Sequence, residues 1–249
     1  MKHFYSKICV VAVALCLSLT SRAEVSVVDG VYQLGTPEDM LEFAQIVLEN
    51  DGQVDAVLTA DIDMSAYPNF TISSSDISYK GVFDGLFHTV TIGYENNENE
   101  YVSLFRKLGS GTIKNLVVNG SLHAIGKHCA TLVGQSVSTG TIENVVTDVA
   151  INTTTVGDGS HSGLIGSVTS ISNTTINNCV IGGSLKSEGM LSTQCGGVIG
   201  WADGKASLNS VLVICEFEIA GSSDGTWGNL TFVRNPGNAS LNNCCYLHA

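Results

Sequence analysis

ATLVGQSVSTGTIENVVTDVAI, the stretch at 130–151, decides the fold because variants of it recur further along the chain. The related stretches are SGLIGSVTSISNTTINNCVIGG at 162–183 and GGVIGWADGKASLNSVLVICEF at 196–217. Each contains an apolar pair followed by glycine, a polar gap, and a second apolar segment around an asparagine or serine. A unit that recurs at this period indicates stacked repeats.

The repeat has fixed positions that extend to both sides of these stretches. Apolar anchors recur with spacings of 29, 34, 32 and 33 residues, at Ile113, Ile142, Ile176, Leu208 and Leu241. Two residues after each anchor stand Asn115, Asn144, Asn178, Ser210 and Asn243. Upstream apolar pairs are Leu104 with Phe105, Leu132 with Val133, Leu164 with Ile165, and Val198 with Ile199, while Leu230 stands alone in the last unit. The middle three pairs precede Gly134, Gly166 and Gly200, whereas Arg106 follows the first pair.

The residue types within the unit predict strands rather than helices. The apolar segments are short and are broken by Gly, Ser, Thr and Asn, without the long runs at 3.6-residue spacing that helical repeats require. A single strand cannot bury its apolar face alone, but copies stacked in register bury a continuous core. We therefore predict an all-β protein, a parallel β-helix of about five repeat coils, taken as right-handed by general precedent, that rises about 4.8 Å per coil.

The recurring asparagines and glycines are interpreted as structural. Asparagine tolerates a left-handed backbone at a tight bend, and stacked asparagine amides can form a hydrogen-bonded ladder. We expect the glycines at 134, 166 and 200 to mark bends with unusual φ angles. Neither column therefore needs a ligand to explain it.

The residues at 24–100 do not repeat and are expected to form an N-terminal cap with entry strands, ahead of the repeats at 101–249. TPEDMLEFAQIVLENDG at 36–52 predicts one amphipathic helix, with Thr36 as N-cap, Pro37 at the first helical position and Asp39 completing a capping box. Its apolar face is expected to contain Met40, Ala44, Val47 and Leu48, and Gly52 is expected to end it. Such a helix can cover the open end of a β-helix.

Several stretches together resemble the GLUG-motif proteins of Bacteroidetes. They are DAVLTADIDMS at 55–65, GVFDGLFHTV at 81–90, the ATLVG, SGLIG and GGVIG units, and the final NNCCYL. The resemblance covers about 30–247, and it departs from the family pattern at Phe87, where glycine is usual. It implies an adhesin-like secreted or surface protein with no assigned activity.

The first residues and the charge balance predict export. The segment at 1–23 has a basic start, the apolar run ICVVAVALCLSL and small residues before a cleavage point after Ala23, as in a secretory signal peptide. A lipoprotein signal acylated at Cys16 is disfavoured because Leu15, rather than a small residue, precedes it. Removal of 1–23 leaves 11 − 3 = 8 basic against 23 acidic residues, a net charge of −15. This charge disfavours nucleic acid and anionic membranes as partners, and no later stretch is long and apolar enough to span a membrane.

The six cysteines of the mature chain allow more pairings than the sequence can choose between: Cys129, Cys179, Cys195, Cys215, Cys244 and Cys245. The repeat places Cys129, His161 and Cys195 in one column. Its outer members lie two coils apart, about 9.6 Å, which is too far for a disulfide and unsuited to a zinc site. Adjacent-coil pairs of Cys215 with Cys244 or Cys245 remain possible in this register.

No catalytic constellation is evident in the sequence. The acids in the repeats occupy different offsets, and Asp61, Asp63, Asp84 and His88 are interpreted as turn and cap residues. We therefore predict a non-enzymatic exported protein, without cofactor or metal, that binds a glycan or protein partner, with Trp201 and Trp227 as candidate contact residues. The alternatives are a polysaccharide lyase or glycoside hydrolase on the same fold, which needs grouped carboxylates, and a repeat module of a larger surface assembly.

Overall fold

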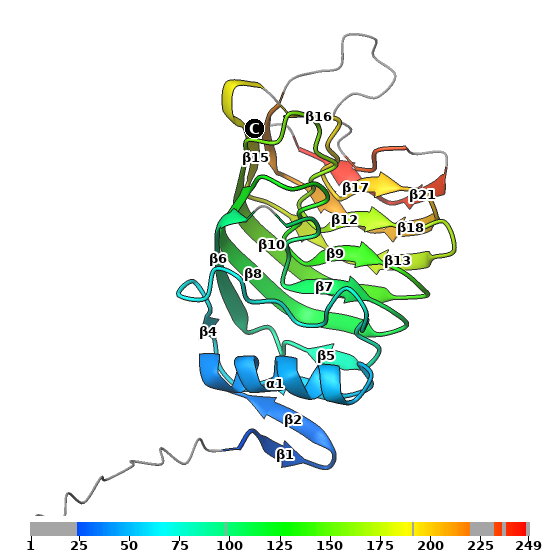
Figure 1. Ribbon diagram of the computed structural model, residues 1–249. Helices are drawn as coiled ribbons and strands as arrows, with labels where there is room; N and C mark the ends of the chain where they lie inside the picture. Colours follow the sequence, from blue (N-terminus) through cyan, green and yellow to red (C-terminus); the bar gives the residue numbers. More distant parts are fainter. Residues whose placement is uncertain (1–23, 98, 191, 220–231, 236–237, 248–249) are drawn as a thin grey trace, which may run out of the picture.

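The chain folds as a parallel β-helix of about six turns with one α-helix (Figure 1). The computed structural model describes residues 24–97, 99–190, 192–219, 232–235 and 238–247. The fold class predicted from the sequence is confirmed. The turn beyond the five repeats arises because β5 (Val82–Asp84) and β6 (Thr89–Asn97) also pair in parallel with β8 (Thr112–Ala124).

The first face of the coil is a stack of parallel strands that contains the apolar anchors. In spatial order they are β2 (Val31–Leu34), β3 (Asp55–Leu58), β5, β8, β10 (Thr141–Thr153), β13 (Asn173–Asn177), β18 (Lys205–Asn209) and β21 (Ala239–Asn242). β1 (Ser26–Val28) pairs antiparallel with β2. The anchors are consecutive strand partners in the order Phe83, Ile113, Ile142, Ile176, Leu208 and Leu241. All but the last are fully buried, whereas Leu241 in the last described turn is 50% exposed.

Two further faces complete each turn. The second contains β4 (Ile62–Asp63), β6, the later halves of β8 and β10, β14 (Val180–Ile181), β15 (Ser184–Ser187), β19 (Leu212–Val213), β20 (Glu216–Glu218) and β22 (Cys245–Tyr246). The third is the parallel sheet of β7 (Phe105–Leu108), β9 (Val133–Ser136), β12 (Ile165–Val168) and β17 (Ile199–Ala202). A smaller pair joins β11 (Gly157–Asp158) to β16 (Ser192–Thr193), next to a 3-10 turn at Glu188–Met190.

The column of asparagines forms the bend between the first and second faces, as predicted. Asn115, Asn144, Asn178, Ser210 and Asn243 all have left-handed φ angles, between 50° and 56°. The Nδ2 of Asn144 donates to the Oδ1 of Asn115 at 2.9 Å, and the Nδ2 of Asn115 donates in turn to a carboxylate oxygen of Asp84 at 2.9 Å. These bonds form part of the expected amide ladder.

The expectation for the repeat glycines is wrong in its physical reason. Gly134, Gly166 and Gly200 lie within β9, β12 and β17, and none has a positive φ. A Cβ atom on these residues would lie 2.3, 1.9 and 1.8 Å from the main-chain oxygens of Tyr101, His128 and Ser160, respectively. The facing residues are themselves left-handed, with φ angles of 64°, 59° and 46°. Glycine is therefore required because a bend of one turn packs directly against the strand of the next.

The last repeat unit also differs from its sequence interpretation. The column of upstream apolar residues runs through Phe105, Val133, Ile165 and Ile199, and the partner of Ile199 is Val233. Leu230, which the sequence pattern placed in this column, lies outside the described residues. Val233 is buried, so it extends the core by one turn.

The helix α1 (Pro37–Glu49) crosses one end of the coil, with the β1–β2 hairpin beyond it (Figure 1). Thr36 is its N-cap and forms the predicted capping box with Asp39. The predicted apolar residues Met40, Ala44 and Val47 are buried. The helix therefore covers the end of the apolar core, as expected of a cap.

Two details of this helix departed from the expected apolar face. Phe43 is fully buried, and its ring centroid lies 6.3 Å from that of Tyr79 and 6.2 Å from that of Phe83. Leu48 is only half-buried. The predicted apolar face is therefore wrong at Leu48 and lacked Phe43, whose ring reaches the first turn of the coil.

Phe87, the departure from the GLUG pattern, has the backbone conformation that glycine favours. Leu86 and Phe87 have φ angles of 46° and 64°, and the main-chain N–H of Phe87 donates to the carbonyl of Asn115 at 2.7 Å. The side chain of Phe87 is 68% exposed. The turn geometry is thus retained although the residue has a Cβ atom.

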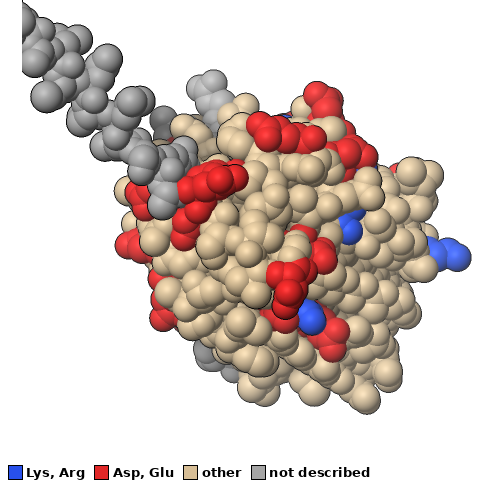
Figure 2. All heavy atoms as spheres, turned by 90° about the horizontal axis from the view of Figure 1, so that it is seen from below, with Lys and Arg blue, Asp and Glu red and all other residues tan. Residues whose placement is uncertain are grey.

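The capped end is acidic. Viewed from this end, Asp and Glu side chains far outnumber Lys and Arg side chains on the surface (Figure 2). None of the helices in the described part of the chain is long and apolar enough to cross a membrane.

Candidate functional site

A row of aligned side chains crosses the third face because its strands pair residue by residue. Lys107 on β7, Gln135 on β9, Ser167 on β12 and Trp201 on β17 are consecutive partners. At about 4.8 Å per strand, Lys107 and Trp201 are about 14 Å apart along the coil axis. Side chains from four turns can therefore contact one extended ligand.

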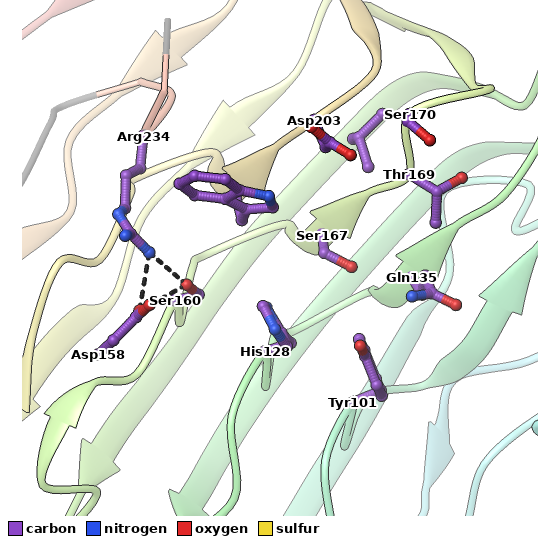
Figure 3. A pocket seen from close by; sticks show the side chains of 12 residues that line it. Tyr101, His128, Gln135, Asp158, Ser160, Ser167, Thr169, Ser170, Asp203 and Arg234 are labelled. Carbon is purple, nitrogen blue, oxygen red and sulfur yellow. Dashed lines mark hydrogen bonds and ion pairs between the residues drawn. The ribbon is translucent and has the colours of Figure 1, made fainter.

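A hollow lies over the upper part of this row (Figure 3). We call it the main pocket. Its volume is about 400 Å³, within the range of small-molecule sites. It is lined by Tyr101, His128, Gln135, Asp158, Ser160, Ser167, Val168, Thr169, Ser170, Trp201, Asp203 and Arg234.

Arg234 is the buried cation of the main pocket. Its side chain comes from the segment at 232–235 and is only 4% exposed. One guanidinium nitrogen donates to Asp158 at 2.7 Å and to Ser160 at 2.6 Å, and another donates to Gln194. The Ser160 hydroxyl donates to the same carboxylate oxygen at 2.8 Å, so the three residues form one cluster at one side of the pocket (Figure 3). The charge of Arg234 is thereby paired and its position fixed.

Trp201, one of the two tryptophans singled out in the sequence, lines the main pocket. The guanidinium carbon of Arg234 lies 4.6 Å from the centroid of its ring, a cation–π contact that orients the indole. The ring is half-buried and so retains exposed surface. Trp227, the other candidate, lies outside the described residues.

Tyr101 and His128 form a stacked pair at the other end of the pocket. Their ring centroids are 5.0 Å apart and the planes differ by 9°. Burial lowers the pKa of His128 below its usual value, although the charges of Glu100 and Asp158 act in the opposite direction. The imidazole is therefore neutral at neutral pH and packs as an aromatic ring.

Two smaller hollows adjoin the main pocket around Tyr101. One, of about 170 Å³, is lined by Ser75, Tyr101, Arg106, Lys107 and Gln135, and we call it the basic pocket. The other, of about 110 Å³, also includes Tyr101 and Arg106. The basic pocket shares Tyr101 and Gln135 with the main pocket, so the two adjoin each other at these residues.

The column of Cys129, His161 and Cys195 exists as the repeat predicted, but it lies inside the coil. The residues that follow them, Ala130, Ser162 and Gly196, are consecutive bridge partners, and all three column members are fully buried. The Nε2 of His161 is 2.9 Å from Thr153 Oγ1 and 3.1 Å from Thr155 Oγ1. Burial lowers the pKa of His161 to about 3, and burial raises the pKa of Cys129 to about 12.

The other residues considered for chemistry have structural contacts. Asp61 accepts from the main-chain N–H of Thr89 at 2.9 Å and lies 3.3 Å from His88 Nδ1, and Asp63 accepts from the N–H of Ser65 at 2.9 Å. Within the described residues, no group of three His, Cys, Asp or Glu side chains is placed to hold a metal. Free thiols are present at Cys129, Cys179, Cys215, Cys244 and Cys245, so the possible pairs of Cys215 are not formed.

One hydroxyl in the lining of the main pocket, that of Ser160, is committed to other side chains of the pocket. The Ser160 hydroxyl contacts Asp158 and Arg234, which is an ion-pair arrangement. The aromatic ring of Trp201 and the polar groups around it are suited to hydroxyl-rich rings. Sequence reasoning found Trp201 but missed Arg234, Asp158, Tyr101 and His128. Tyr101, His128 and Arg234 lie in bends and Asp158 in the two-residue strand β11, and only the register shows which turns face one another.

Comparison with known proteins supports the fold. A crystal structure described as that of a putative immunoglobulin A1 protease from Bacteroides ovatus is similar, with a TM-score of 0.60 and 16% sequence identity over 87% of this chain and 75% of that chain. At this identity the similarity concerns the fold alone. No family model and no curated protein matches the chain, so membership of the GLUG-motif proteins stays a prediction.

Proposed function

We propose that this chain is a non-enzymatic, exported, adhesin-like β-helix protein that uses the main pocket to bind a glycan, with a protein partner as the less favoured ligand. The proposal of export rests on the signal-like sequence at 1–23. The proposal of binding rests on one observation above all, the ring of Trp201 held in the wall of the pocket by buried Arg234.

The surroundings of the ring favour a sugar over an apolar ligand. Gln135, Thr169, Ser170 and Asp203 line the same pocket and offer amide, hydroxyl and carboxylate groups. Sugar hydroxyls can both donate to the carboxylate and accept from the amide and hydroxyl groups. Because Trp201 is anchored to a rigid sheet, little side-chain entropy is lost when a ring packs against it.

An enzymatic alternative has one feature in its favour, since Asp158 and Asp203 both line the pocket. Glycoside hydrolysis needs two carboxylates, one of them a proton donor. Asp158 is paired with Arg234 at 2.7 Å, so its carboxylate is already bound by a cation at one side of the pocket. We therefore favour binding without turnover.

Binding can be followed through Trp201 itself. The chain has two tryptophans, so the Trp227→Phe variant leaves Trp201 as the sole indole fluorophore. The mature variant would be screened on a glycan array, and hits would be titrated by fluorescence and calorimetry. We expect saturable binding that shifts Trp201 emission.

A matched pair of aromatic truncations locates the site. Trp201→Ala should reduce affinity at least about fivefold, because a stacked aromatic contact contributes roughly 1–3 kcal/mol. Phe87→Ala removes an exposed aromatic that is no part of the pocket lining and should leave affinity unchanged. Equal effects of both variants, or no ligand on the array, would contradict the proposal.

The non-enzymatic part needs its own assay. The mature protein would be incubated with a polysaccharide panel and, in view of the similar Bacteroides structure, with immunoglobulin A1. We expect no new reducing or unsaturated sugar ends and an intact heavy chain. Turnover that disappears in Asp203→Asn would instead support the hydrolase or lyase alternative.

A further inference from the structure

Half of the eight basic residues that follow residue 23 form ion pairs within the described part of the chain. Lys80, Lys114, Lys186 and Arg234 form ion pairs with Asp51, Asp84, Glu218 and Asp158, respectively. Arg106 and Lys107 are adjacent on β7, and no described carboxylate forms an ion pair with either. Lys127 and Lys205 also form no ion pair with a described carboxylate, but only Arg106 and Lys107 are adjacent in the chain and line one pocket together.

Main-chain oxygens orient these two cations without neutralising them. Arg106 donates to the carbonyl of Glu100 at 3.0 Å, and its guanidinium lies 6.0 Å from the ring centroid of Tyr101. The ammonium group of Lys107 donates to the carbonyl of Ser75. A guanidinium has five donors and an ammonium three, so each keeps donors for a ligand.

Both cations line the basic pocket, which adjoins the main pocket at the shared lining residues Tyr101 and Gln135. Lys107 and Trp201 begin and end the same row of strand partners, about 14 Å apart. One ligand of a few linked rings can therefore contact the two cations at one end and the indole at the other.

The charges change sign along this path. The basic pocket is lined by Arg106 and Lys107 and by no acidic residue, whereas the main pocket is lined by Asp203 and by Asp158, whose charge is paired with that of Arg234. An anionic group is thus favoured at the first end. In the main pocket, carboxylates can accept hydrogen bonds from neutral sugar hydroxyl groups, and they repel a second anionic group. A polyanion with charge on every unit fits this arrangement poorly.

We infer that the glycan bound here is an acidic oligosaccharide with its anionic sugar in the basic pocket, against Arg106 and Lys107, and neutral sugar units toward Trp201. This inference rests on the proposed function. A carboxylate and a sulfate share the required chemistry, and the choice between them is left to the experiment.

The test uses three matched probes and the full mature chain. The probes are an oligosaccharide with one terminal uronic acid, its carboxyl-reduced neutral counterpart, and a counterpart with one sulfate on the terminal unit. We expect an anionic probe to bind at least about tenfold more tightly than the neutral probe, as charge-assisted hydrogen bonds warrant. Tighter binding of the sulfated probe would assign the site to sulfate.

Variants then locate the anion. Arg106→Gln and Lys107→Gln should each remove most of this preference and leave affinity for the neutral probe within about twofold. Lys186→Gln removes one positive charge from a different face and should change nothing. Thermal unfolding of each variant confirms that the fold is retained.

The outcomes separate the two proposals. Equal affinity for the acidic and neutral probes, with both lost in Trp201→Ala, would overturn the anionic assignment and leave the proposed function standing. A preference that persists in Arg106→Gln with Lys107→Gln would overturn it as well. Failure of all probes and of the glycan array would overturn both.

Discussion

Acid should destabilise this protein through His161, an interior histidine that the fold keeps neutral. Its imidazole is fully buried and bonded to Thr153 and Thr155, and burial lowers its pKa to about 3 from a reference of 6.5. Between these values the unfolded chain binds a proton that the folded chain does not. The free energy of unfolding therefore falls as the pH falls from about 6.5 toward 3.

The size of the effect follows from the two pKa values. Each unit of difference corresponds to about 1.36 kcal/mol, so the 3.5-unit gap sets an upper limit of about 5 kcal/mol at very low pH. At pH 5, the pH lies about 1.5 units below the reference pKa of the histidine in the unfolded chain. The expected loss in the free energy of unfolding is therefore about 2 kcal/mol.

Urea unfolding followed by circular dichroism at pH 8 and pH 5 measures this loss. The matched variant is His161→Gln, whose amide can still bond to the threonine hydroxyls but does not titrate. Contributions from the carboxylates are largely common to both proteins and cancel in the difference, whereas the repulsion between His128 and a protonated His161 is part of the effect measured. The wild type should lose about 2 kcal/mol more than the variant, and equal losses would refute the buried, neutral histidine.

Three further substitutions test the coil itself by urea unfolding. Gly166→Ala should lower the free energy of unfolding by about 1–3 kcal/mol or more, because the added Cβ would lie 1.9 Å from the carbonyl oxygen of His128. An unchanged free energy of unfolding would mean that the bend does not pack against this strand. Ile142→Ala should lower the free energy of unfolding by about 2–5 kcal/mol. Leu241→Ala, at the same repeat position but half exposed, should lower it much less. Similar losses in the two variants would contradict the register. Phe87→Gly should raise the free energy of unfolding by about 1 kcal/mol, because the left-handed backbone strains an L-residue and the exposed side chain gains little from burial. A lower free energy of unfolding would show that the ring packs against the protein.

The stacking of turns could be predicted because one column of residues reports it directly. Ile113, Ile142 and Ile176 recur at nearly fixed spacing, and asparagine follows each at the position that bends with a left-handed backbone. The apolar anchor and the asparagine both lie within one repeat unit. Side chains alternate between the two faces of a strand, so the pattern of apolar residues shows which of them point inward. The capping helix was predictable for the same reason, since Thr36 and Asp39 act within one helical turn.

The glycines show where such reasoning ends. Sequence suggests an unusual φ at Gly166, but the cause is the carbonyl of His128, which belongs to the preceding turn. Arg234 was missed for a similar reason. Its partners Asp158 and Ser160 are 76 and 74 residues earlier, and no periodic pattern marks a side chain that occurs once.

The pocket depends on the same stacking, because only register brings Lys107 and Trp201 into one row. Distance measurement by pulsed electron paramagnetic resonance tests that register directly, with spin labels on unnatural amino acids at Val82 and Ser240, which leave the cysteines untouched. These exposed positions are joined by five steps of strand pairing, through Thr112, Thr141, Thr175 and Ser207. We predict a single distance near 24 Å, at about 4.8 Å per step, and a value about 10 Å shorter for labels at Val82 and Thr175. Distances that do not scale with the number of repeats between the labels would contradict the stacked coil.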